Sequence, residues 1–116
     1  MSDLQDTIYE LERGFWTGDA DYYRAHGDET CLVIFPGMVK ALSRAELAET
    51  VTAGPRWQDL KIEPKGILHP SPGVVVIAYE ASARKGDEPR YAAAVSSGYV
   101  DRGGLWKLAW HQQTPL

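Results

Sequence analysis

The sequence has little of what marks several common protein classes. Its 116 residues include a single cysteine, Cys31, so no disulfide can form within the chain. No apolar run approaches the roughly 20 residues of a membrane-spanning helix, and residues 1–6 lack the basic start and apolar stretch of a secretion signal. The formal net charge is −4, without a basic cluster that would suit nucleic acid or an anionic membrane. We therefore expect one cytoplasmic domain over residues 1–116, with neither nucleic acid nor membrane as a partner.

Cofactor and metal motifs are also missing. The spacings His-x-His, Cys-x-x-Cys and His-Glu-x-x-His do not occur. No glycine-rich segment follows a strand and opens a helix, and Gly103-Gly104 is typical of a hairpin turn. Cys31 lies in an apolar run, which favours a small core residue over a nucleophile. The sequence thus predicts no metal and no cofactor.

What is present is a regular order of helix and strand signals. Apolar periodicity, capping residues and turns predict the following elements: helix 3–16, helix 20–26, strand 30–35, strand 39–42, a helix that begins after Ser43 and stops at Gly54-Pro55, and strands 57–63, 74–84, 90–101 and 105–114. Helices gathered in the first half and strands in the second indicate an α+β fold.

Several of these segments resemble the nuclear transport factor 2-like superfamily. The resemblance lies in Phe15-Trp16, Gly18-Asp19, Pro36-Gly37, the helix start Ser43-Arg44-Ala-Glu46, and the ending from Gly104 to Pro115, which is similar to the SnoaL-like branch and its bacterial domains of unknown function. The resemblance implies a cone-shaped, strongly curved antiparallel sheet wrapped round N-terminal helices, a cystatin-like α+β barrel with a pocket. Members are often homodimers and include isomerases, dehydratases, cyclases, hydrolases and binding proteins, so the fold alone selects no activity.

Strand alternation predicts which side chains line the cone. The bulkier set of each strand should point inward, and aromatic residues of the first half should close the cavity. The expected ligand-binding residues are Trp16, Tyr23, Phe35, Met38, Tyr79, Tyr91, Ser97, Tyr99, Trp106, Trp110 and Gln112. Such a lining suits a small, mostly apolar ligand held by a few hydrogen bonds. The simpler alternative is that the aromatic rings fill the cone and leave no pocket.

The side chains expected on the outer face of the sheet predict a homodimer. They are small or β-branched and mostly uncharged, whereas a sheet face in water usually carries charged and polar residues. They are Val74, Val76, Ala78, Ala92, Ala94, Ser96 and Ala109, with His111 beside them. Two such faces could pack together about a two-fold axis. The alternative is that a β-bulge shifts the parity and turns this face inward.

A catalytic function is the alternative hypothesis. An isomerase, dehydratase or cyclase of the SnoaL or ketosteroid isomerase kind would use His111, Tyr79 or Tyr99 as acid or base. Strict alternation places His111 on the outer face, and a bulge near Gln112-Gln113 would reverse this. An ionisable group other than tyrosine in the cavity would favour catalysis over binding.

Carboxylates give the catalytic hypothesis little support. The resemblance implies an aspartate base in the isomerases, in a cavity that tunes its pKa. Here Asp59, Glu63 and Glu80 fall on predicted outer faces. Asp28 and Glu29 precede the first strand, where a solvated loop is the simpler interpretation.

Overall fold

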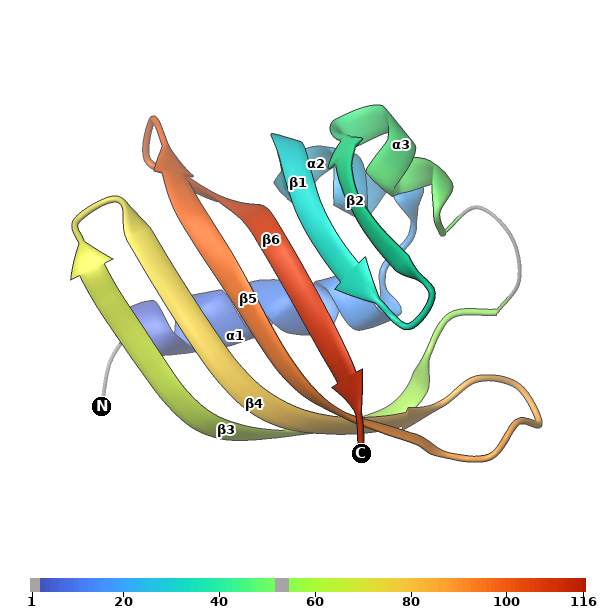
Figure 1. The fold of residues 1–116 in the computed structure, drawn as a ribbon. Helices are drawn as coiled ribbons and strands as arrows, with labels where there is room; N and C mark the ends of the chain where they lie inside the picture. The colour runs from blue at the N-terminus through green and yellow to red at the C-terminus, as the bar shows by residue number, and fades with distance from the viewer. Residues whose placement is uncertain (1–2, 52–54) are drawn as a thin grey trace.

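The computed structural model describes residues 3–51 and 55–116 (Figure 1). Its elements follow the predicted order: α1 (Asp3–Thr17), α2 (Ala20–His26), β1 (Gly27–Phe35), β2 (Met38–Ser43), α3 (Arg44–Glu49), β3 (Gln58–Ser71), β4 (Val74–Arg84), β5 (Tyr91–Arg102) and β6 (Leu105–Pro115). Within the described residues, no helix combines the length and the apolar character needed to cross a membrane.

Capping residues fix where the short helices begin. The Asp19 carboxylate accepts a hydrogen bond from the backbone N–H of Tyr22 and so caps α2. At α3 the predicted capping box is present: Ser43 Oγ accepts from Glu46 N at 3.1 Å, and Ser43 N donates to Glu46 Oε1 at 2.9 Å. The predicted stop of this helix at Gly54 lies outside the described residues.

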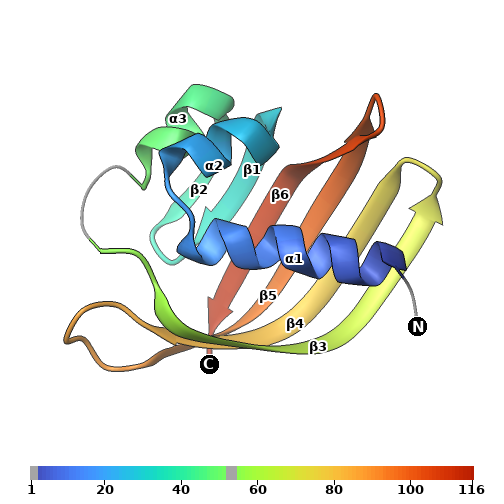
Figure 2. The same ribbon diagram turned by 180° about the vertical axis from the view of Figure 1, so that it is seen from behind.

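The strands form one strongly curved, unclosed sheet in the order β2-β1-β6-β5-β4-β3. All neighbours are antiparallel except β1 and β6, which run parallel, so the expected antiparallel sheet contains one parallel pairing. Figure 2 shows α1 crossing one face of the sheet, with α2 and α3 beside β1 and β2. The predicted α+β architecture is confirmed, and the helices cover only the inner face.

Strand β3 is much longer than its sequence suggests. The predicted strand 57–63 extends to Ser71, through Pro64 and Pro70, although a loop was expected from Pro70. A proline cannot donate to a ladder, but β3 is an edge strand and its free side can tolerate one. The pairing with β4 shifts register between Pro64 and Gly66, which accommodates the first proline.

Cys31 is fully buried in the core, as its apolar neighbours predict. Burial, with smaller contributions from Glu12 and Asp28, raises the pKa of its thiol to about 12. The thiolate is therefore negligible at neutral pH, and Cys31 is a packing residue rather than a nucleophile.

Candidate functional site

A β-bulge in β6 decides which side chains enter the site. Tyr99 of β5 pairs with Leu108 and Gly98 pairs with Trp110, so Ala109 is an extra residue without a partner. Before Ala109 the predicted alternation holds, and Leu108 is buried. After it the alternation is inverted, and His111 is a buried residue that lines the largely apolar pocket described below. The prediction that His111 lies on the outer face was wrong, because the bulge occurs at Ala109 and not near Gln112-Gln113.

The same bulge moves Trp110 and Gln112 to the outside. A Cβ added to Gly98 would lie 2.3 Å from the Trp110 ring, so this indole packs flat on the backbone of β5. The Ser97 side chain bonds Glu12 inside the fold, which places the neighbouring Gly98 and its covering Trp110 on the outer face. Gln112 accepts a hydrogen bond from Ser96 on that face. Trp110 and Gln112 therefore do not line the pocket as expected.

A buried carboxylate, Glu12 of α1, lies at the centre of the inner face. It is completely inaccessible to solvent, and hydroxyl groups of β4 and β5 surround it. Ser97 and Tyr99 donate to it at 2.6 Å each, and Tyr79 donates as well. His111 Nδ1 lies 3.3 Å from Glu12 Oε2. The sequence carried a signal that the prediction missed, because Glu12 interrupts the apolar stripe of α1, four residues after Ile8 and three before Phe15.

Glu12 and its tyrosine partners hold opposite protonation states. Burial by itself raises the pKa of Glu12, but the hydrogen bonds from His111, Ser97 and Tyr79, together with the charge that His111 carries when protonated, outweigh it, and the pKa is lowered. Burial and the adjacent Glu12 charge raise the pKa of Tyr79 and of Tyr99 well above the usual range. The carboxylate is therefore ionised at neutral pH and the two phenols remain neutral donors.

Counting protons along these contacts fixes the tautomer of His111. The single hydroxyl proton of Ser97 is given to Glu12, so Ser97 Oγ accepts from His111 Nδ1, which lies 2.7 Å away. In the neutral imidazole, Nε2 then carries the free lone pair. It accepts from the Gln113 amide nitrogen at 2.9 Å, and Gln113 Oε1 accepts from the Tyr91 hydroxyl at 2.9 Å.

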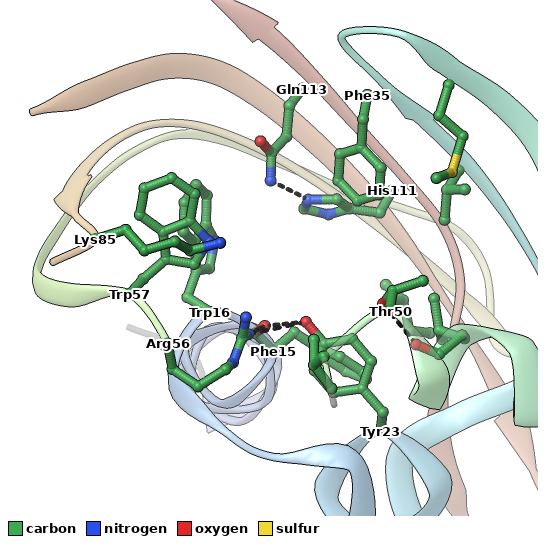
Figure 3. A pocket seen from close by; sticks show the side chains of 15 residues that line it. Phe15, Trp16, Tyr23, Phe35, Thr50, Arg56, Trp57, Lys85, His111 and Gln113 are labelled. Atoms are coloured by element: carbon green, nitrogen blue, oxygen red, sulfur yellow. Dashed lines mark hydrogen bonds between the residues drawn. The ribbon is translucent and has the colours of Figure 1, made fainter. Parts of the chain in front are cut away.

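His111 faces a pocket of about 260 Å³ beside α1, α3 and the ends of β1 and β6 (Figure 3). Its lining is largely apolar and aromatic: Phe15, Trp16, Tyr23, Val33, Phe35, Met38, Leu47, Val51, Trp57 and Leu108, with the polar residues Thr50, Arg56, Lys85, His111 and Gln113. The alternative in which aromatic rings fill the cone is thereby ruled out.

The predicted ligand-binding residues divide into three groups. Trp16, Tyr23, Phe35 and Met38 line the pocket. The fully or almost fully buried Tyr79, Ser97 and Tyr99 lie behind it, as partners of Glu12. The remaining four are outside the lining: Tyr91 stacks on Trp57 at its edge, Trp106 packs near His69, and Trp110 and Gln112 are on the outer face.

Two cations complete the pocket on the side opposite His111 (Figure 3). Arg56 donates from Nε to Gly18 O and from Nη2 to Phe15 O, both at 2.7 Å, and so binds the carbonyls at the end of α1. Lys85 Nζ lies 4.4 Å from the centre of the Trp57 ring. Neither cation was among the predicted site residues. Both lie next to the paired ends of β3 and β4.

Asp28, another of the acidic candidates, is accounted for by local pairing. Asp28 lies within β1, not in a solvated loop, and Arg102 donates to both of its carboxylate oxygens, at 3.0 and 2.8 Å. This pairing holds the pKa of Asp28 below its usual range. Among residues 3–51 and 55–116, no three His, Cys, Asp or Glu side chains converge as a metal site would require.

Comparison with known proteins gives a structural match only. Neither a scan against protein-family models nor a search of curated proteins finds a match. Among solved structures, a nuclear transport factor 2-like protein of unknown function from Prochlorococcus is 15% identical, with a TM-score of 0.79 over 99% of this chain and 94% of that one. The chain has the nuclear transport factor 2-like fold.

Other structures with this fold carry enzyme names. A ketosteroid isomerase-like protein from Erwinia carotovora is 16% identical, with a TM-score of 0.78 over 97% of this chain and 92% of that one. A scytalone dehydratase-like protein from Novosphingobium aromaticivorans is 15% identical, with a TM-score of 0.71 over 97% and 81%. Such identities establish the nuclear transport factor 2-like fold alone, so the chemistry has to be argued from the site.

Proposed function

We propose that the protein binds a small, mostly apolar molecule in this pocket and that His111 removes a proton from it. The observation that carries the proposal is the ionisable imidazole in a largely apolar lining, backed by a fully buried carboxylate. Proton transfer of this kind belongs to isomerases and eliminating enzymes, and two proteins of the same fold bear isomerase-like and dehydratase-like names. Simple binding without chemistry would leave the Glu12–His111 pair without a role beyond packing.

The contacts of His111 suit a general base. Ser97 and Glu12 hold Nδ1–H, so the lone pair of Nε2 is directed at the pocket side, where Gln113 donates to it. A substrate could displace the Gln113 amide and direct its own acidic hydrogen at Nε2. That proton would then be transferred to Nε2. The Glu12 carboxylate would then stabilise the imidazolium that forms, as a buried carboxylate does in other acid–base sites.

An uncharged probe can test the base without knowledge of the natural substrate. The probe 5-nitrobenzisoxazole is flat and opens to a coloured phenolate when a base removes its ring proton. We expect the wild-type protein to accelerate this reaction, and His111→Gln to reduce the acceleration by about 10²-fold or more, the usual contribution of a positioned base. His69→Gln is the matched control, because His69 is exposed on β3 outside the pocket.

Circular dichroism of each variant verifies that it is folded. Equal rates for wild type and a folded His111→Gln variant would overturn the proposal.

We also infer that the protein is a homodimer joined through the outer face of the sheet. Support comes from the predicted small residues Val74, Val76, Ala78, Ala92, Ala94, Ser96 and Ala109, of which all but Ala78 are half-buried. Leu32 and Ile34 of β1, 50% and 40% exposed, extend the face, and the half-buried Trp110 occupies the place expected for His111. An exposed apolar sheet surface of this kind is typical of protein–protein contacts.

Light scattering after gel filtration tests the dimer. We expect twice the chain mass of 12.9 kDa for the wild type and the chain mass for Val76→Glu. Leu105→Glu, at the exposed β5–β6 hairpin, is the control and should leave the mass unchanged. A wild-type monomer at micromolar concentration would refute the inference.

A further inference from the structure

Arg56 and Lys85 are two cations on one side of the pocket, and neither has a counter-ion there. Both belong to the lining, and Figure 3 shows their charged ends directed into the hollow opposite His111 and Gln113. Neither forms an ion pair with a carboxylate of the described residues. The five remaining residues, 1–2 and 52–54, include no acidic side chain. This is unusual in a chain whose formal net charge is −4.

The guanidinium of Arg56 is held in place by the fold. Nε and Nη2 donate to the backbone carbonyls of Gly18 and Phe15, and Nη2 also donates to the Tyr23 hydroxyl at 3.1 Å. Nη1 makes no hydrogen bond with the part of the chain that the structure describes. Nη1, with its two N–H groups, is thus left for a ligand on a fixed, permanently charged group, and little side-chain entropy would be lost on binding.

Lys85 supplies a second donor next to a flat aromatic surface. Its ammonium group lies over Trp57, and Trp57 in turn stacks on Tyr91 with ring centres 5.3 Å apart. Burial and the positive charge of Arg56 both lower the pKa of Lys85, while Glu88 acts weakly in the opposite direction. The two cations therefore repel each other, and a bound anion would relieve that repulsion.

We propose that Arg56 and Lys85 bind the carboxylate of a planar aromatic acid, with its ring against the apolar lining of the pocket. The cavity of about 260 Å³ suits one or two fused rings. One free guanidinium nitrogen and one ammonium nitrogen match the two oxygens of a carboxylate one to one, whereas a phosphate group presents three terminal oxygens. The inference rests on the proposed function and deepens it, because the carboxylate held by the two cations would direct a separate acidic hydrogen of the same molecule toward His111 across the pocket.

The test compares 1-naphthoate with 1-naphthamide, which has nearly the same shape but no charge, by isothermal titration calorimetry. At low ionic strength we expect naphthoate to bind at least tenfold more tightly than the amide. Added salt should reduce the preference, because the charges lie in a pocket open to solvent. Lys85→Met keeps an unbranched chain over Trp57 and should lose most of the preference, whereas Lys65→Met, an exposed lysine of β3 paired with Glu63, should retain it.

Equal affinity for the acid and the amide, or no binding of naphthoate, would overturn the assignment. So would tighter binding of 1-naphthyl phosphate than of naphthoate, or a Lys85→Met variant that keeps the full preference. The outcome is independent of the proton-transfer test, since 5-nitrobenzisoxazole is uncharged and binding requires no turnover. Naphthoate preference without His111-dependent elimination would leave an anion-binding pocket and remove the catalytic proposal.

Discussion

On one side of the pocket a carboxylate is fully buried behind His111, and on the other side two cations face the open hollow. Glu12 accepts from three hydroxyl groups and lies beside an imidazole, so its charge is completely satisfied within the fold. Arg56 and Lys85 have no carboxylate partner among the described residues. The charge of Glu12 therefore stabilises the fold, whereas the charges of Arg56 and Lys85 are available to a ligand.

This contrast predicts that the two sides respond oppositely to mutation. A buried charge with exact partners cannot be removed without leaving those partners unsatisfied. Lys85, which forms no ion pair among the described residues, can be removed with little consequence for folding but with a large consequence for binding, whereas Arg56 also binds backbone carbonyls at the end of α1.

Glu12→Ala should be the most destabilising change. It leaves the hydroxyl donors of Tyr79, Ser97 and Tyr99 without their common acceptor and opens a cavity beside His111. Breaking a buried charged network by removing one partner costs about 3–5 kcal/mol of unfolding free energy, measured here by urea denaturation. Glu10→Ala, on the exposed side of the same helix, should cost less than about 1 kcal/mol. Similar losses for the two variants would mean that Glu12 is not the centre of the inner face.

Lowering the pH should reduce the free energy of unfolding, because Glu12 becomes protonated. The ordinary pKa of Glu12 is 4.5 and the folded state lowers it, so the folded protein binds this proton less readily than the unfolded chain. The stabilisation is present in full above pH 4.5 and is lost as the pH falls from there through the folded pKa.

Glu12→Gln isolates this contribution from those of other carboxylates such as Asp28, whose pKa is also lowered. The difference in unfolding free energy between wild type and Glu12→Gln should shrink when urea denaturation is repeated from about pH 7 to about pH 3. A difference that stays constant over that range would contradict an ionised Glu12 in the folded state.

The bulge that directs His111 inward can be tested at Gly98. The Trp110 ring occupies the space that a Cβ at position 98 would need, at 2.3 Å. Gly98→Ala should therefore cost about 1–3 kcal/mol by overpacking. In Gly98→Ala/Trp110→Ala the added methyl group should cost much less, because the indole is gone. Additive effects in this double-mutant cycle would mean that the two residues do not compete for the same space.

Much of the fold was predictable because it follows from local patterns. The capping residues Asp19 and Ser43 and the period of the strands are readable in the sequence, and each produces the element expected. Strand β3 was underestimated because Pro64 ends a strand in most contexts, and only the sheet order reveals an edge that tolerates it.

The site was less predictable because it depends on a one-residue register shift in β6. Ala109 gives no sequence signal for a bulge, and the period-two rule inverts every side chain after it, so His111 and Trp110 exchange faces. Glu12 was detectable as a charge in an apolar helix stripe. Arg56 and Lys85 were not, because they come together only when the ends of β3 and β4 meet α1.

The smallest expected effect on stability is that of Lys85→Met, and it is the sharpest contrast with Glu12→Ala. Lys85 has no ion pair among the described residues, and its repulsion by Arg56 is stronger than its attraction to Glu88. The substitution removes this repulsion while the side chain can still cover Trp57. We expect the unfolding free energy to remain within about 0.5 kcal/mol of wild type in urea titrations, even though the variant loses its preference for naphthoate. A loss of stability comparable to that of Glu12→Ala would show that Lys85, like Glu12, is part of the folded core and not a group held ready for a ligand.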